Sequence, residues 1–261
     1  MRSFLRRFLL CVSLLVVSLS VLADELIVIP TREGVTDSYW WMPRDNARAN
    51  LILLSGGSGG IGYRNGTPQS NNFLIRSRDH FATGNLNGAF NVALLGNASD
   101  LRQLDPRLRA TPEHVADIAA VVAHIRARNP LPIWLVGTSQ GTISAAAAAI
   151  SLGDKVSGMV LSASMTSFRW PTSVPQLAID KITLPVLVIS HEQDSCRATL
   201  PTEGKYIMEK LTQTPIKKFV LLAGGSNPTG DPCEALHWHG FINMESEASK
   251  VITDWILQPT P

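Results

Sequence analysis

The sequence predicts an α/β protein with a mostly parallel central sheet and helices on both faces. Short runs of Val, Ile and Leu alternate with longer helical patterns along the chain, and this alternation is typical of parallel sheets whose strands are buried on both faces. The chain has 261 residues, of which 45% are hydrophobic and 17% charged, as expected for one ordinary domain. Because ligands of such sheets bind beyond the carboxyl ends of the strands, the residues that follow each apolar run are the candidates for a functional site.

The individual elements follow from local patterns, taken in chain order. The expected strands are residues 25–30, 35–42, 50–54, 91–95, 131–136, 158–162, 186–190 and 217–222. The expected helices are residues 111–128, 140–152, 201–211 and 241–257. Thr111-Pro112 supplies an N-cap and a first-turn proline. A high alanine content favours the second helix, and apolar residues at helical spacing indicate the last one.

The first residues have the order of a secretory signal peptide. Three arginines precede an apolar run, and the run ends at Val21-Leu22-Ala23 before Asp24. The run is short for a membrane span of about 20 residues, which favours cleavage over the alternative, an uncleaved anchor. We therefore expect residues 1–23 to be a signal peptide and 24–261 a single domain that is exported to the periplasm or secreted. The pair Arg6-Arg7 leaves both the general and the twin-arginine export routes open.

Removal of the signal peptide changes the charge of the chain. The whole sequence has 23 Lys and Arg against 21 Asp and Glu, and residues 1–23 hold three of the basic residues and no acidic one. The remaining chain is thus close to neutral, with 20 basic and 21 acidic residues. This balance gives no reason to expect nucleic acid as a partner, and we expect no stable membrane insertion after cleavage.

Two of the three cysteines, Cys196 and Cys233, remain after removal of the signal peptide. Two cysteines in an exported chain pair more often than not, so a disulfide between them is the favoured interpretation and two buried thiols are the alternative. The sequence contains neither a C-x-x-C nor an H-E-x-x-H motif, so we expect no metal site.

The motif Gly137-Thr138-Ser139-Gln140-Gly141 is the first candidate for a catalytic site. G-x-S-x-G is weak by itself, but here it joins a predicted strand directly to a predicted helix. That junction forces its middle residue into a strained conformation and exposes the hydroxyl near a helix N-terminus. Ser139 is therefore the candidate nucleophile, and an ordinary glycine-rich turn with a serine cap is the alternative.

A serine nucleophile needs a base and an orienting carboxylate, expected here in the chain order Ser, acid, His. Asp194 follows the strand at 186–190, and we prefer it to Glu192, which is too close to the strand end. His239 and His237 follow the last strand. We expect His239 to be the general base because it directly precedes a glycine and the terminal helix.

The other histidines are less suitable. His80 precedes the later strands, His114 and His124 are expected on the solvent face of their helix, and His191 is interpreted as a structural neighbour of the acid. If the disulfide forms, it ties the loop of the acid to the loop of the histidine and restrains their contact.

The glycine run at residues 55–60 follows an early strand. Gly57 to Gly62 match the dinucleotide fingerprint G-x-G-x-x-G, but turn-forming residues follow where that fingerprint requires a helix. We prefer an oxyanion loop, in which the backbone N–H of Gly57, or alternatively Ser58, joins that of Gln140 to bind a developing negative charge.

At these residues the chain resembles the α/β-hydrolase superfamily, over roughly residues 50–257. It is similar to small exported bacterial serine hydrolases of unassigned substrate, which share the segment Asn72-Phe73-Leu74-Ile75-Arg76-Ser77-Arg78. Where the family often has His-Gly after its third strand, this chain has Ser55-Gly56. Only residues 165–184 stand where many members insert a helical lid, so a minimal lid and an open, shallow cleft are implied rather than an interfacially activated lipase.

The sequence thus predicts a serine hydrolase that cleaves a carboxylic ester through an acyl-enzyme, with Ser139, His239 and Asp194 as the triad and no cofactor. The alternatives are an amidase or peptidase with the same triad and a non-catalytic binding protein of the same fold. A small-molecule ester or amide is the expected partner.

Overall fold

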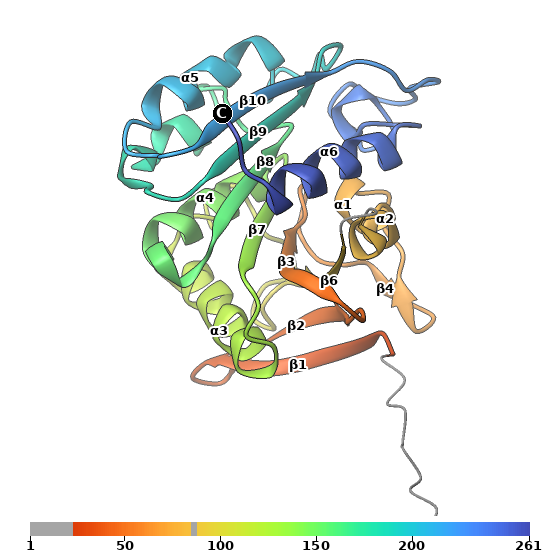
Figure 1. Cartoon of the computed structure of the whole chain (residues 1–261), viewed down its shortest axis with the longest axis vertical. Coiled ribbons are helices and arrows are strands. Elements are labelled where there is room, and N and C mark those ends of the chain that lie inside the picture. The colour runs from red at the N-terminus through yellow and green to blue at the C-terminus, as the bar shows by residue number, and fades with distance from the viewer. Residues whose placement is uncertain (1–22, 85–87) are drawn as a thin grey trace, which may run out of the picture.

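The computed structural model describes residues 23–84 and 88–261, so the predicted signal peptide, apart from Ala23, lies outside the described residues. The chain forms an eight-stranded sheet in the order β1-β2-β6-β3-β7-β8-β9-β10 (Figure 1). Strand β2 runs antiparallel to both of its neighbours, and all other neighbouring pairs are parallel. The strands are β1 (Glu25–Arg32), β2 (Val35–Met42), β3 (Ala47–Leu54), β6 (Ala89–Leu95), β7 (Ile133–Thr138), β8 (Gly158–Ser162), β9 (Val186–His191) and β10 (Lys217–Leu222).

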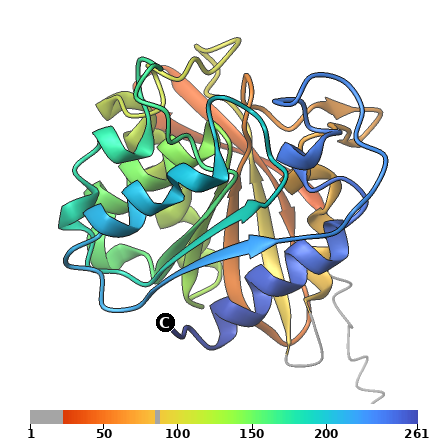
Figure 2. The same ribbon diagram turned by 90° about the horizontal axis from the view of Figure 1, so that it is seen from above.

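Helices cover both faces of this sheet, which confirms the predicted fold class. One face carries α3 (Pro112–Arg128), α4 (Gly141–Leu152) and α5 (Gly204–Lys210). The other face carries α1 (Phe73–Arg76), α2 (Arg78–Thr83) and α6 (Glu245–Leu257). Figure 2 shows these layers from a second direction. The green and cyan helices lie together on one side of the sheet, and α6, in dark blue, lies on the other side.

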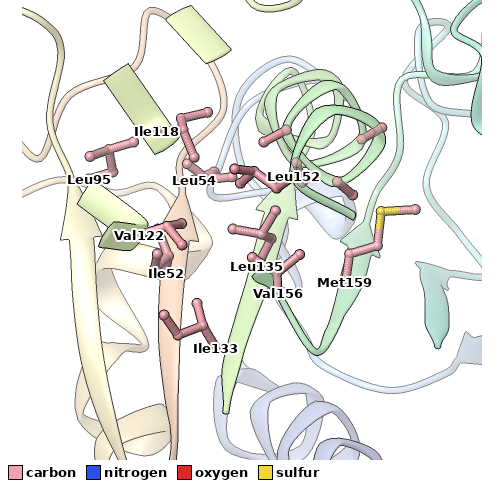
Figure 3. Close-up of a cluster of buried hydrophobic side chains, with 14 of the residues drawn as sticks. Ile52, Leu54, Leu95, Ile118, Val122, Ile133, Leu135, Leu152, Val156 and Met159 are labelled. Carbon is pink, nitrogen blue, oxygen red and sulfur yellow. The ribbon is translucent and has the colours of Figure 1, made fainter. Parts of the chain in front are cut away.

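The central strands are apolar along their whole length because both of their faces are buried. In β3, Ile52 and Leu54 point into the core beneath α3 and α4, whereas Leu51 and Leu53 point into the core beneath α1, α2 and α6. Figure 3 shows the first of these cores, where Ile118 of α3 lies above the strands. Each such side chain contributes about 1.5–3 kcal/mol when it is fully buried.

The structure differs from the sequence prediction mainly at element ends and in short elements. The terminal helix begins at Glu245 rather than residue 241 because Phe241 and Asn243 have φ values of +56° and +55°, which a right-handed helix excludes. Helices α1 and α2 were not expected, although Asn72 caps α1 through its side chain. A small hairpin, β4 (Tyr63–Arg64) with β5 (Thr67–Pro68), was not expected either.

The sheet reverses its order at β3, which lies between β6 and β7. In open α/β sheets a crevice forms at such a switch point, outside the carboxyl ends of the strands. Between β8 and β9 the chain forms only two short 3₁₀ turns, Val174–Gln176 and Ile179–Lys181, in place of a helical lid. Within the described part of the chain, no helix combines the length and apolar character needed to cross a bilayer.

Asp37 of β2 is a buried carboxyl group whose ionisation should affect the stability of the protein. Its side chain is 3% exposed, and burial raises its pKa to about 7, opposed in part by a hydrogen bond that Ser38 N donates to its carboxylate. In the unfolded chain the pKa is about 4. Between these values only the unfolded state is ionised, so this group destabilises the fold increasingly as the pH rises from about 4 to 7.

We therefore predict that Asp37→Asn stabilises the protein above pH 7, by up to about 4 kcal/mol, and has little effect near pH 4. Urea unfolding of both proteins at pH 4, 6 and 8 measures the difference. An effect of equal size at all three pH values would show that ionisation of Asp37 is not its cause.

Candidate active site

Ser139 lies on a tight turn between β7 and α4. Its φ of +52° is in the left-handed region, as expected for the middle residue of a strand-to-helix junction. The two glycines of the motif are required by close packing. A Cβ on Gly137 would lie 2.5 Å from Gly141 O, and a Cβ on Gly141 would lie 2.0 Å from Leu54 O at the end of β3. The side chain of Ser139 is half-buried.

Asp194 and His239 meet across the carboxyl ends of the strands. Asp194 follows β9, and His239 lies in the 3₁₀ turn Trp238–Gly240 before α6. His239 Nδ1 is 3.1 Å from Asp194 Oδ2, and both side chains are buried. Because a carboxylate only accepts hydrogen bonds, Nδ1 carries the proton and Nε2 is left as the acceptor nitrogen. The competitor Glu192 is exposed.

Thr199 is a third member of this arrangement, and sequence reasoning missed it. Its Oγ lies 3.0 Å from Asp194 Oδ2 and 3.0 Å from His239 Nδ1. The hydroxyl of Thr199 donates to the carboxylate of Asp194. Its oxygen and Asp194 Oδ2 both accept from the Nδ1–H of the imidazole. The second carboxylate oxygen, Asp194 Oδ1, accepts from Cys196 N at 2.9 Å, so Asp194 is fixed from two sides.

Ser139 and His239 line the same cavity, which has a volume of about 320 Å³. Most of the remaining lining comes from the glycine loop at residues 55–60, from residues 70–73 and from residues 233–235. In the described part of the chain, the Ser139 hydroxyl makes no hydrogen bond to His239. Apo structures of hydrolytic sites often show this contact loosened.

The glycine loop packs directly on the nucleophile turn. A Cβ on Gly56 would lie 2.8 Å from Ser139 Cβ. Within the described residues, neither Gly57 N–H nor Gln140 N–H donates a hydrogen bond to a protein group. Two free amide donors beside a strained serine are what a site for an oxyanion needs. The dinucleotide alternative loses its required context, because a hairpin rather than a helix follows the loop.

Cys196 and Cys233 form a disulfide that closes a loop of 37 residues. Cys196 lies two residues after Asp194, and Cys233 lines the cavity next to the segment that leads to His239. The bond therefore joins the two loops that bring acid and imidazole together. Arg76 adds a second restraint on the histidine side, because it donates to Gly240 O and pairs with Glu245 at 2.8 Å.

The prediction for His114 was wrong. His114 is 5% exposed rather than facing solvent, and its Nε2 lies 2.9 Å from Ser144 Oγ. His124 is half-buried and contacts the hydroxyl of Tyr39. His191 is buried and stacks on Trp238 with ring centroids 4.8 Å apart. Among the described residues, no group of three or more His, Cys, Asp or Glu side chains is arranged to hold a metal ion.

The disulfide gives a second testable prediction. In the chain-entropy model a loop of this length contributes about 3–4 kcal/mol, so the free energy of unfolding of the double variant Cys196→Ser/Cys233→Ser should be lower by that amount, as measured by denaturant unfolding. Maleimide labelling of the denatured, unreduced protein should leave both residues unmodified, and labelling after reduction should modify both. Two reactive thiols before reduction would contradict the pairing.

A family model described as serine aminopeptidase, S33, matches residues 105–194, a segment that contains Ser139 and Asp194 but neither the glycine loop nor His239. No curated protein gives a significant match to the sequence.

Several solved structures resemble the chain over most of its length. An esterase from Pyrococcus furiosus has 14% identity, covers 91% of each chain and has a TM-score of 0.64. A dienelactone hydrolase from Anabaena variabilis has 15% identity, covers 92% of this chain and 99% of its own, and has a TM-score of 0.63. An α/β serine hydrolase without a lid from Xanthomonas campestris has 15% identity, coverage of 91% and 96%, and a TM-score of 0.59. Together with the sheet topology, these likenesses show that the chain has the α/β-hydrolase fold.

Proposed function

We propose that the protein is a serine hydrolase that cleaves carboxylic esters through an acyl-enzyme. The observation that carries the proposal is the buried hydrogen bond between His239 Nδ1 and Asp194, formed in the wall of the cavity that also holds Ser139 on its strained turn. A nucleophile, a base and a group that orients the base are the three parts that acyl transfer requires.

In the proposed reaction Ser139 Oγ attacks the carbonyl carbon while His239 Nε2 accepts the hydroxyl proton. The N–H groups of Gly57 and Gln140 bind the oxyanion that forms. The tetrahedral intermediate collapses, the C–O bond to the alcohol breaks, and His239 returns the proton to the departing alkoxide. Water then attacks the acyl-enzyme with His239 again as the base, which releases the acid and restores Ser139.

An ester is the proposed substrate because an alkoxide leaves more readily than an amide nitrogen and demands less of the site. The resemblance to an esterase and a lidless serine hydrolase supports this choice. The family description, serine aminopeptidase, favours an amide or peptide as the second candidate. The short segment between β8 and β9 supports a substrate that needs little enclosure.

Export is part of the proposal. It is supported by the order of charged, apolar and small residues in 1–23 and by the disulfide, because such bonds persist in oxidising compartments. We propose that residues 24–261 form the exported enzyme, in the periplasm or outside the cell.

Labelling with a fluorophosphonate tests the proposed nucleophile. We expect modification at Ser139, together with hydrolysis of 4-nitrophenyl acetate, and loss of both in Ser139→Ala and His239→Ala by a factor of about 10³ or more. Asp194→Asn should also lose activity, because the imidazole loses its orienting carboxylate, whereas its matched control, Glu192→Gln, should retain activity. Absence of labelling in the wild-type protein would favour a non-catalytic binding protein, and faster turnover of aminoacyl anilides than of esters would favour the amidase.

Thr199 gives a further test of how the imidazole is held. Thr199→Val removes the hydroxyl that donates to Asp194 and contacts His239, and one hydrogen bond to a charged group is worth about 1.5 kcal/mol. We therefore expect kcat to fall about tenfold while KM stays nearly constant. Thr199→Ser keeps the hydroxyl and should retain most of the activity; equal losses in both variants would rule out this role.

A further inference from the structure

Arg109 is a buried cation behind the glycine loop, and the proposed reaction does not use it. Its side chain is 1% exposed. It stands shortly before α3 and does not line the cavity of Ser139; with Ser55, Gly59 and Gly60 it lines a second, smaller pocket. A buried guanidinium is costly unless its surroundings compensate the charge.

The guanidinium of Arg109 donates hydrogen bonds to two backbone carbonyls of the glycine loop. Nη1 donates to Ser55 O at 3.1 Å, and Nη2 donates to Gly57 O at 2.9 Å. These carbonyls belong to the peptides on either side of the Gly56–Gly57 peptide, which carries the Gly57 N–H. The carbonyl of that middle peptide, Gly56 O, accepts from Gly59 N at 3.1 Å. All three carbonyls are thus fixed, and the Gly57 N–H between them is left free of protein partners.

Two further side chains, Ser144 and His114, hold the guanidinium in place. Nη1 also donates to Ser144 Oγ of α4 at 3.2 Å, and Ser144 Oγ lies 2.9 Å from His114 Nε2 of α3. Burial, reinforced by the charge of Arg109, lowers the pKa of His114 to about 4. The imidazole is therefore neutral at pH 7, and the Ser144 oxygen, which is hydrogen-bonded to its Nε2, also accepts from Arg109.

The positive charge of Arg109 is not neutralised by a carboxylate in contact. Within the described part of the chain it forms no ion pair, and its Nε is buried without a hydrogen-bond partner. Burial lowers its pKa to about 9, so it stays protonated at neutral pH. The acceptors that face the cation are two carbonyl oxygens and the Ser144 hydroxyl, and an anion that forms at the Gly57 N–H would gain from the field of the cation.

We infer that Arg109 is a positioning residue that aims the Gly57 N–H at the reacting carbonyl oxygen and places a positive charge behind the resulting oxyanion. The inference rests on the proposed function, because it assigns a role within that reaction. Arg109 touches neither nucleophile nor base, so it should affect the stabilisation of the oxyanion without changing the identity of the attacking group.

The test uses Arg109→Met, Arg109→Lys and a matched control, Arg107→Met. The Arg107 side chain is 73% exposed and pairs with Asp105. With 4-nitrophenyl acetate we expect Arg109→Met to lower kcat about 100-fold with KM changed less than about threefold, on the scale of losing one oxyanion donor. Arg109→Lys keeps the charge but cannot reach both carbonyls with one nitrogen, so a loss of about tenfold is expected. Arg107→Met should behave as wild type.

A readout specific to the oxyanion separates this role from a merely structural one. 2,2,2-Trifluoroacetophenone should add to Ser139 as a hemiketal, whose oxygen occupies the oxyanion site. Its ionisation can be followed by ¹⁹F NMR against pH. We expect the pKa of this oxygen to be higher in Arg109→Met than in wild type by about 1–2, since a tenfold effect corresponds to one pKa unit. Arg107→Met should leave it unchanged.

Each outcome has a distinct meaning. An unchanged hemiketal pKa in a folded Arg109→Met, or a loss of activity through KM alone, would overturn the inference. If Arg109→Met fails to fold, kcat and the hemiketal pKa are measured on Arg109→Lys instead. Wild-type values of both quantities in Arg109→Lys would overturn the inference. Failure of the proposed function is recognised separately, because the wild-type protein would then form no hemiketal and take no fluorophosphonate at Ser139.

Discussion

The close approach of the nucleophile turn to the end of β3 is the constraint on which the site depends. No atom larger than hydrogen fits on Gly141, where a Cβ would lie 2.0 Å from Leu54 O, and Gly56 is similarly packed against Ser139. This packing places the N-terminus of α4 beside the glycine loop. Gly57 and Ser139 therefore line one cavity, and Gln140 follows Ser139 directly, at the point where the order of the strands reverses. Among the described residues, neither Gly57 N–H nor Gln140 N–H has a protein acceptor.

The acid and the histidine reach the same point from distant parts of the chain, and they are held there by covalent and polar restraints. The disulfide joins their loops. Thr199 and the backbone of Cys196 fix the carboxylate, and Arg76 holds the carbonyl that follows His239. These contacts limit the motion of His239 relative to Asp194, so that the imidazole keeps the tautomer that a general base needs.

The parts of the fold and site that local sequence determines were predictable. The strand, the turn at Ser139 and the helix are adjacent in the chain, and glycine spacing revealed the turn. The positions of Asp194 and His239 followed from their order after later strands. His114 could have been placed correctly as well, because it lies four residues before Ile118 and eleven before Ile125, on the buried face of α3.

Thr199 and Arg109 could not have been found in this way. Thr199 contacts His239, which is 40 residues away, and Arg109 contacts Ser55, which is 54 residues away, so no local pattern marks the role of either residue. The start of α6 was missed for a related reason: the left-handed residues Phe241 and Asn243 are imposed by the turn that presents His239.

The central claim is that Ser139, His239 and the two amide donors act on one carbonyl group. A crystal structure of the wild-type protein after reaction with a fluorophosphonate tests it most directly. We expect a phosphonyl group on Ser139 Oγ, with its oxygen about 3 Å from both Gly57 N and Gln140 N, and His239 Nε2 within hydrogen-bond reach of Ser139 Oγ. A phosphonyl oxygen directed away from the glycine loop, or an imidazole that stays out of reach of Ser139, would contradict it.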